Sequence, residues 1–196
     1  MIPSPKKHIH NTVLPIALMG EEILKQSAKP VQQKDLPYIR DLSDKMIHTV
    51  TQLGERIGLA APQVFEDYRL FVYRIPKTIH SRYGGGVLEE LPFEVVINPV
   101  ITFLSDEKVD GYEACISVPH MMGRVSRFLS LQMDYVDLNF KPKRRLATGF
   151  HARVIQHEFD HLEGIVYPMR MTSFEHFGFE DVLTRGLSST QIEQIC

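Results

Sequence analysis

Five residues late in the chain, His157-Glu158-Phe159-Asp160-His161, form the pattern H-E-x-x-H. Side chains four positions apart on an α-helix lie above one another on one face, so the two imidazoles can bind the same metal ion. Glu158 lies beside them, where a carboxylate can carry a proton. The alternative is two surface histidines on an amphipathic helix. A metal centre therefore requires a third ligand and a substrate site from the rest of the chain.

A helix over residues 148–163 is predicted to carry this pattern. Thr148 is suited to the N-cap position, and Gly164 stands where helices usually end. Phe150 and Val154 fall at helical spacing on the same broad face as the two histidines. The metal-binding face is therefore expected to continue into an apolar face.

The size and charge of the chain exclude several classes of protein. Its 196 residues, 43% hydrophobic and 23% charged, are typical of one globular domain. A net charge of −2 offers no basic surface for nucleic acid, and two cysteines are too few for a disulfide framework. No apolar run is long enough to span a membrane, and His8, His10 and Asn11 interrupt the N-terminal segment where a signal peptide would be apolar. We therefore expect a cytoplasmic protein without nucleic-acid or membrane partners.

The pattern of apolar residues predicts the order of helices and strands. Apolar side chains recur every three or four positions over residues 36–53, which indicates a long helix. Strands are predicted over residues 69–75, 93–104, 108–117 and 128–138, and short helices over 174–183 and 189–195. Three segments are expected to be loops: a tightly packed one over 57–64, a glycine-rich hairpin tip over 79–90 and a solvated basic turn over 141–145. This order, without regular βα alternation, indicates an α+β fold with an antiparallel sheet.

The third metal ligand has two possible sources. A catalytic site has three protein ligands and one open position, and most H-E-x-x-H proteases take the third ligand from downstream. This chain offers Glu175, His176 and Glu180 there, whereas Glu163 lies on the wrong side of the helix. Cys115 is the rival, because a thiolate is a strong ligand, although a free cysteine is most often a small buried hydrophobe. These residues alone leave both sources open.

Three segments together resemble, in order and spacing, the three motifs of peptide deformylases. They are Ile57-Gly58-Leu59-Ala60-Ala61-Pro62-Gln63, Glu113-Ala114-Cys115-Ile116-Ser117 and His157-Glu158-Phe159-Asp160-His161. Residues 15–31 are similar to the start of that domain, so the resemblance covers about residues 13–175. Four positions depart from the family pattern: Arg56 and Ala114 stand where glycine is usual, Ile116 where leucine is frequent, and Met122 where many bacterial members have arginine.

The resemblance implies a single α+β domain in which antiparallel β-sheets pack around a central metal-binding helix that carries the HEFDH pattern. It divides the chain into a flexible lead-in over residues 1–12, a deformylase-like catalytic domain over 13–175 and a C-terminal helical extension over 176–196. A monomer is expected.

The resemblance also implies a metal-dependent hydrolase that removes the N-formyl group from the N-terminal methionine of newly synthesised polypeptides, near the ribosome. Cys115, His157 and His161 would hold one divalent ion, which turns a bound water into hydroxide near neutral pH. Ferrous iron is the expected ion, with zinc or nickel able to use the same ligands.

Three further residues receive catalytic roles from the resemblance. Glu158 would act as general base toward the water and then as general acid toward the leaving amine. The side-chain amide of Gln63 and the backbone N–H of Ile116 would donate hydrogen bonds to the developing oxyanion.

The substrate peptide is expected to lie extended, with its backbone paired to Ile57 and Gly58. Ile57 is expected to form a wall of an apolar methionine pocket, and Arg124 is the candidate polar contact. An arginine in place of Met122 is expected to lower KM for short formyl-methionyl peptides.

Two other functions compete with deformylation. A zinc endopeptidase would use the two histidines with a downstream acid, and would keep its metal after Cys115→Ser. A domain with a structural metal would need a fourth protein ligand, for which His120 and His151 are the candidates. Metal content together with formate release from a formyl-methionyl peptide distinguishes the three.

Overall fold

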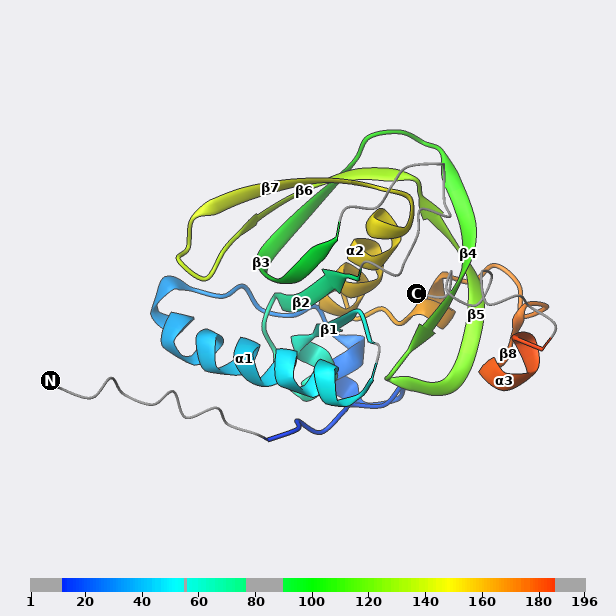
Figure 1. Cartoon of the computed structure of the whole chain (residues 1–196), viewed down its shortest axis with the longest axis horizontal. Helices are drawn as coiled ribbons and strands as arrows, with labels where there is room; N and C mark the ends of the chain where they lie inside the picture. The colour runs from blue at the N-terminus through cyan, green and yellow to red at the C-terminus, as the bar shows by residue number, and fades with distance from the viewer. Residues whose placement is uncertain (1–11, 55, 77–89, 186–196) are drawn as a thin grey trace, which may run out of the picture.

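The computed structural model describes residues 12–54, 56–76 and 90–185, in which two antiparallel β-sheets enclose a central helix, α2 (Figure 1). Helix α2 spans Gly149–Leu162, and a second long helix, α1, spans Leu36–Gln52. The predicted α+β fold with antiparallel sheets is therefore confirmed. None of the helices in these described ranges combines the length and apolar character needed to cross a membrane.

The larger sheet has five strands in the order β1-β2-β3-β6-β7, and every neighbouring pair is antiparallel. Its strands are β1 (Gly58–Ala60), β2 (Leu70–Ile75), β3 (Leu91–Phe103), β6 (Ser130–Val136) and β7 (Pro142–Thr148). Strand β6 alternates between buried and half-buried residues, as expected for a strand with one face on the core.

Strand β2 is buried on both faces because a helix covers each side of the sheet there. Phe71 and Tyr73 pack in the same cluster as Ile155 of α2. The alternate residue Val72 packs in a second cluster with Ile39 of α1. Successive side chains of a strand point to opposite faces, so this continuous apolar strand separates two cores.

The smaller sheet has three strands in the order β4-β5-β8 and lies on the other side of α2 (Figure 1). The strands are β4 (Lys108–Cys115), β5 (Val118–Phe128) and β8 (Phe177–Phe179). Strands β4 and β5 form a hairpin in which Cys115 pairs with Val118. The tight connection through Ile116 and Ser117 places Cys115 at the end of β4, facing α2.

Short helices complete the described chain. They are the 3-10 helices η1 (Glu22–Lys25), η2 (Gln33–Asp35), η3 (Ala61–Val64) and η4 (Tyr167–Arg170), and the helix α3 (Glu180–Leu183). The segment 57–64 was expected to be a loop, and this prediction is wrong: Gly58–Ala60 pairs with β2, and η3 follows at once.

The basic segment 141–145 was expected to be a solvated turn. Lys141, Lys143 and Arg144 are exposed as expected, but residues 142–145 are the start of the edge strand β7 rather than a turn. Pro142 is the first residue of this strand, a position where its missing N–H breaks no ladder. The charges are paired across the sheet: the Nε atom of Arg144 lies 2.7 Å from Asp134 Oδ1. The basic run therefore lies along a sheet edge, where an exposed pair of this kind contributes at most about 1 kcal/mol.

Strand β5 was not predicted from the sequence, because no element was expected over residues 118–127. A single helix over 174–183 is wrong in its first half, because Phe177–Phe179 pairs with β5 before α3 begins. Most of the predicted hairpin tip over 79–90 and all of the helix over 189–195 lie outside the described residues. The division of the chain at residues 12 and 175 stays a prediction.

Candidate metal centre

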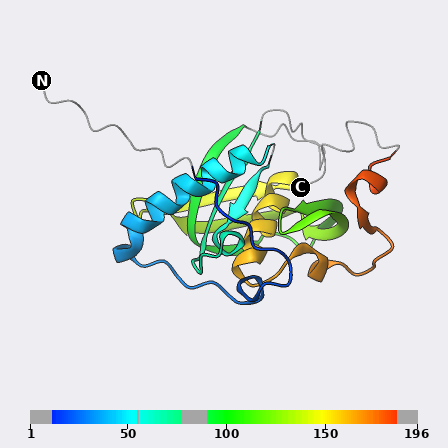
Figure 2. The same cartoon turned by 90° about the horizontal axis from the view of Figure 1, so that it is seen from below.

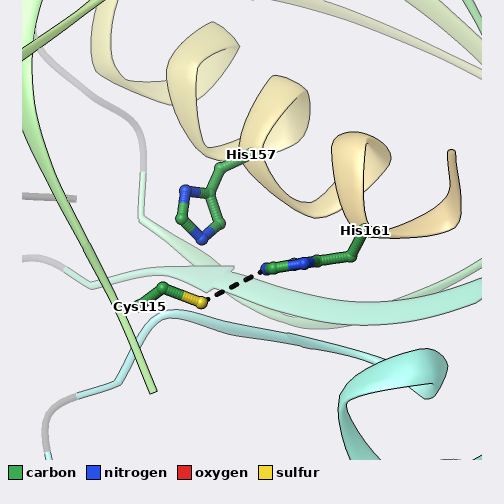
Figure 3. Close-up of side chains that lie close together, drawn as sticks. All are labelled: Cys115, His157 and His161. Carbon is green, nitrogen blue, oxygen red and sulfur yellow. Dashed lines mark hydrogen bonds between the residues drawn. The ribbon is translucent and has the colours of Figure 1, made fainter. Parts of the chain in front are cut away.

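Cys115, His157 and His161 form a buried cluster between the β4–β5 hairpin and α2 (Figure 3). One potential ligand atom from each residue lies within 4.8 Å of the others. Cys115 Sγ is 3.4 Å from His161 Nε2. Both histidines project from α2 toward the sulfur, because they are four positions apart on the helix.

The fold brings Cys115, and not the downstream candidates, to the two histidines. These three residues are the one group of at least three His, Cys, Asp or Glu side chains with metal-binding spacing in the part of the chain that the structure describes. Glu175, His176 and Glu180 are not part of it. His120 and His151 are not part of it either, and His151 Nε2 instead lies 3.1 Å from the Tyr73 hydroxyl. Three ligands without a fourth match a catalytic site rather than a structural one.

The donor set fits a divalent transition metal. A thiolate with two imidazoles suits iron, zinc or nickel. Burial raises the pKa of the Cys115 thiol, but the charge of His161 and hydrogen bonds to both histidines outweigh it and hold that pKa well below its usual range. The sulfur is therefore poised in the deprotonated form that binds metals.

Glu113 fixes the orientation of His157. Its Oε2 atom lies 2.9 Å from His157 Nδ1, which leaves Nε2 free to bind a metal. The Glu113 side chain is fully buried, and Arg127 binds both of its oxygens at 2.8 Å. Burial raises the pKa of Glu113, but Arg127 and His157 outweigh it and hold this carboxyl ionised. Arg153 adds a fourth hydrogen bond to Glu113, at 2.8 Å.

Asp160, near the end of α2, also binds Arg127. Its Oδ2 atom accepts a hydrogen bond from Arg127 Nη1 at 2.6 Å, and Arg170 of η4 contacts both of its oxygens. Glu113 and Asp160 thus share Arg127 from opposite sides. No role for these residues was predicted from the sequence. Glu113 was recognisable, because it stands two positions before Cys115 on a strand and so shares its face.

Glu158 reaches the cluster from the helix without binding another described residue. Its Oε2 atom is buried and has no hydrogen-bond partner within the described ranges. Burial raises the pKa of this carboxyl to about 7, against the opposing charges of His157 and His161. A group with this pKa can both accept and release a proton near neutral pH.

Gly58 provides the room that Glu158 occupies. A Cβ atom at Gly58 would lie 2.3 Å from Glu158 Oε1, closer than any ordinary contact. The sequence analysis assigned Gly58 to the substrate peptide. The structure adds a second reason for glycine at this position of β1.

Gln63 presents its amide group to the cluster in a fixed orientation. Its Oε1 atom accepts a hydrogen bond from the backbone N–H of Ala60 at 2.9 Å. The Nε2 atom donates to Ser117 Oγ at 3.1 Å and to Cys115 Sγ at 3.3 Å. Because Oε1 is held by a backbone donor, the NH₂ group must face the sulfur. Ile116 lies in the turn between the two residues that this amide contacts.

Comparison with known proteins gives the family of this cluster. Residues 13–177 match the model of the polypeptide deformylase family. The chain belongs to that family. It is 40% identical to peptide deformylase 2 of Ralstonia nicotianae over 87% of this chain and 94% of the relative, and 40% identical to peptide deformylase 2 of Pseudomonas putida over 90% and 97%. The similarity to deformylases therefore extends over most of the chain and is not confined to the three motifs.

Solved deformylase structures show the same fold. The Met-Ala-Ser-bound crystal structure of a class I type b peptide deformylase from Acinetobacter baumannii has a TM-score of 0.73 at 35% identity, and covers 82% of this chain and 99% of that one. The Thermotoga maritima peptide deformylase has a TM-score of 0.70 at 30% identity, with 83% and 99% covered.

The residues assigned to the substrate of this deformylase are not all brought to the cluster. Ile57 packs against the core cluster beside α2, and Gly58 lies on the edge strand β1. Arg124 is exposed, and its Nη2 atom lies 2.9 Å from Asp110 Oδ2. Its cross-strand partner Tyr112 alternates with the inward-facing Glu113, so Arg124 points away from the metal ligands. Substrate binding by Arg124 stays a prediction that its position does not support.

Met122 is fully buried, which contradicts its interpretation as a substrate-facing position. It pairs with Ala114 on one side and with Gly178 on the other. The position where many bacterial deformylases have arginine is therefore a buried residue in the middle strand of the smaller sheet. An arginine at 122 would bring a charge into this buried position.

Proposed function

We propose that this deformylase removes the formyl group from the N-terminal methionine of nascent polypeptides by metal-dependent hydrolysis. The observation that carries the proposal is the buried Cys115, His157 and His161 cluster with Glu158 and Gln63 beside it. Cys115, His157 and His161 would hold the ion, with ferrous iron first and zinc or nickel as alternatives. When bound, such an ion supplies Lewis-acid chemistry that lowers the pKa of water and polarises a carbonyl.

Glu158 moves the proton in this proposal. Its carboxylate takes a proton from the attacking water, and the same proton then passes from Oε2 to the nitrogen that leaves the formyl carbon. The pKa of about 7 suits both steps, because neither protonation state is strongly favoured near neutral pH. The free Oε2 atom is available for this transfer because it has no hydrogen-bond partner among the described residues.

Gln63 and Ile116 would stabilise the negative charge that develops on the formyl oxygen. The Gln63 amide is held in orientation by Ala60 and Ser117, and its N–H toward Cys115 Sγ would turn to the formyl oxygen as the charge appears. The Ile116 N–H lies in the tight turn next to Cys115. One such donor is typically worth about 2.7–4 kcal/mol of the activation barrier.

The substrate would bind as an extra strand along β1. Gly58–Ala60 is an edge strand that pairs only with β2 within the described residues, so its other edge can pair with an extended peptide. Ile57 would contact the methionine side chain. The Acinetobacter baumannii relative, solved with bound Met-Ala-Ser, supports a peptide of this kind as the ligand.

Formate release from formyl-Met-Ala-Ser by protein loaded with ferrous iron tests this function. We expect release of formate from the formylated peptide and no turnover of its acetylated counterpart. Release of amino acids or shorter peptides without formate would instead support a zinc endopeptidase. Activity that persists after Cys115→Ser would contradict the proposed ligand set.

A further inference from the structure

The segment Val13–Val31, which we name the N-terminal strap, forms hydrogen bonds to two motif segments and to the residue that follows the third. The backbone N–H of Ala17 donates to Gln63 O at 2.8 Å. The N–H of Met19 donates to Ser117 O at 2.7 Å, and the N–H of Ala28 donates to Leu162 O at 2.8 Å. These acceptors lie in or directly beside the first, second and third motifs. The strap is the blue segment that faces the viewer in Figure 2.

We propose that Met19 is a positioning residue whose backbone N–H orients the Ile116-Ser117 turn, and through it the two oxyanion donors. This inference rests on the proposed function. Ser117 is fully buried and connects the two sides: its carbonyl accepts from Met19, and its hydroxyl accepts from Gln63 Nε2. A shift of the turn would therefore move both the Ile116 N–H and the hydroxyl that anchors the Gln63 amide.

Met19 acts through its backbone rather than its side chain. The side chain is exposed to 52%, so it contributes little packing. Ala17, two residues before Met19, is fully buried, and its N–H donates a hydrogen bond to Gln63 O. These contacts fix the strap immediately before the turn. The Met19 N–H is thus held in register by a buried neighbour while its own side chain faces solvent.

The local turn permits a test that removes only this N–H. Residues Leu18 to Glu21 form a β-turn closed by the Glu21 N–H to Leu18 O hydrogen bond at 3.0 Å. Gly20 has φ +115°, whereas Met19 has no positive φ, which is the sign pattern of a type II turn with Met19 at its second position. Proline is favoured at that position. Met19→Pro therefore keeps the turn and removes the donor.

The first measurement is steady-state kinetics on formyl-Met-Ala-Ser with the metal-loaded enzyme. We expect Met19→Pro to lower kcat by about 10- to 10²-fold with KM within about twofold, because oxyanion donors act in the transition state. Met19→Ala restores the N–H and should rescue kcat to near the wild-type value. Equal kcat for the two variants would overturn the proposal, as would an increase in KM without a loss of kcat.

The second measurement does not depend on turnover. Amide hydrogen exchange of metal-free protein, followed by NMR, should show faster exchange at Ile116 and Ser117 in Met19→Pro than in Met19→Ala. Unchanged exchange would overturn the proposal. If wild-type protein releases no formate, the proposed function fails, while this comparison still decides whether the strap orders the turn.

A second variant covers the case in which Met19→Pro does not fold. Gly20→Ala keeps every N–H and meets no atom within 4 Å, but alanine is strained at φ +115°. It should accelerate exchange at Ile116 and lower kcat in the same direction by a smaller factor. Wild-type exchange and kcat in folded Gly20→Ala would count against the proposal.

Discussion

Gly58→Ala should separate the two roles that glycine has at this position. The added Cβ atom would stand 2.3 Å from Glu158 Oε1 and 2.7 Å from its Cδ, whereas ordinary contacts begin at 3.4 Å. The carboxylate therefore has to move by about 1 Å. Because these atoms are the end of a flexible side chain, the movement should cost only about 1 kcal/mol of unfolding free energy.

The same displacement of the Glu158 carboxylate should lower kcat strongly. A reacting group misplaced by about 1 Å can lose about 10²-fold in rate, since proton transfer requires hydrogen-bond distance. We therefore expect Gly58→Ala to lower kcat by about 10²-fold, to retain its metal, and to change KM little. An effect on peptide pairing alone would raise KM instead.

The assay is formate release over a range of formyl-Met-Ala-Ser concentrations, with metal content measured on the same samples. Gly178→Ala in β8 is the matched control, because its Cβ would meet Leu183 at an ordinary 3.5 Å. Wild-type kcat in folded, metal-loaded Gly58→Ala would refute the reasoning. An increase in KM with kcat unchanged would show that the glycine serves the peptide rather than Glu158.

Four further predictions concern single side chains. Cys115→Ala should lose the metal and all turnover while remaining folded by circular dichroism; normal metal content would remove Cys115 from the ligand set. Glu158→Gln should keep the metal and lose about 10²–10⁴-fold in kcat; metal loss in folded protein would contradict its role as proton carrier. Met122→Arg, once expected to lower KM, should instead cost about 3 kcal/mol in urea unfolding, because it buries a charge in a packed site; unchanged stability would contradict this. His151→Leu should flatten the pH dependence of stability between pH 7 and 5, measured by urea unfolding.

The surroundings of His151 determine whether its titration raises or lowers stability as the pH falls. Burial and the charge of Arg145 lower the pKa of His151 from 6.5 to about 4, with Glu94 opposing them. The unfolded chain therefore binds a proton between about pH 6.5 and 4 that the folded protein does not, so stability falls as pH falls through this window. From pH 7 to 5 the loss is about 2 kcal/mol. Parallel pH profiles of variant and wild type would show that His151 does not contribute.

The sequence predicted the parts of the site that lie within one element or one motif. Two histidines four apart on a helix share a face wherever the helix packs. Cys115 could be placed beside them only by resemblance, because 42 residues of chain separate it from His157 and local spacing carries no information over that length. The basic segment 141–145 was predicted to be a turn for a related reason: most of its charges are exposed, but its strand pairing is made with β6, and Asp134 and Glu94 that pair with Arg144 and Arg145 come from other strands.

The buried charges of α2 explain why the helix was only partly predictable. An amphipathic helix was expected, yet 11 of its 14 residues are buried, including Arg153, Glu158 and Asp160. Each paired charge takes its partner from the smaller sheet or from η4: Arg153 binds Glu113, and Asp160 binds Arg127 and Arg170. A buried charge without a partner would be costly. Among the charged residues of α2, Glu158 has one carboxylate oxygen, Oε2, without a hydrogen-bond partner in the described chain. A proton carrier needs such an oxygen, because it must be free to accept and release the proton.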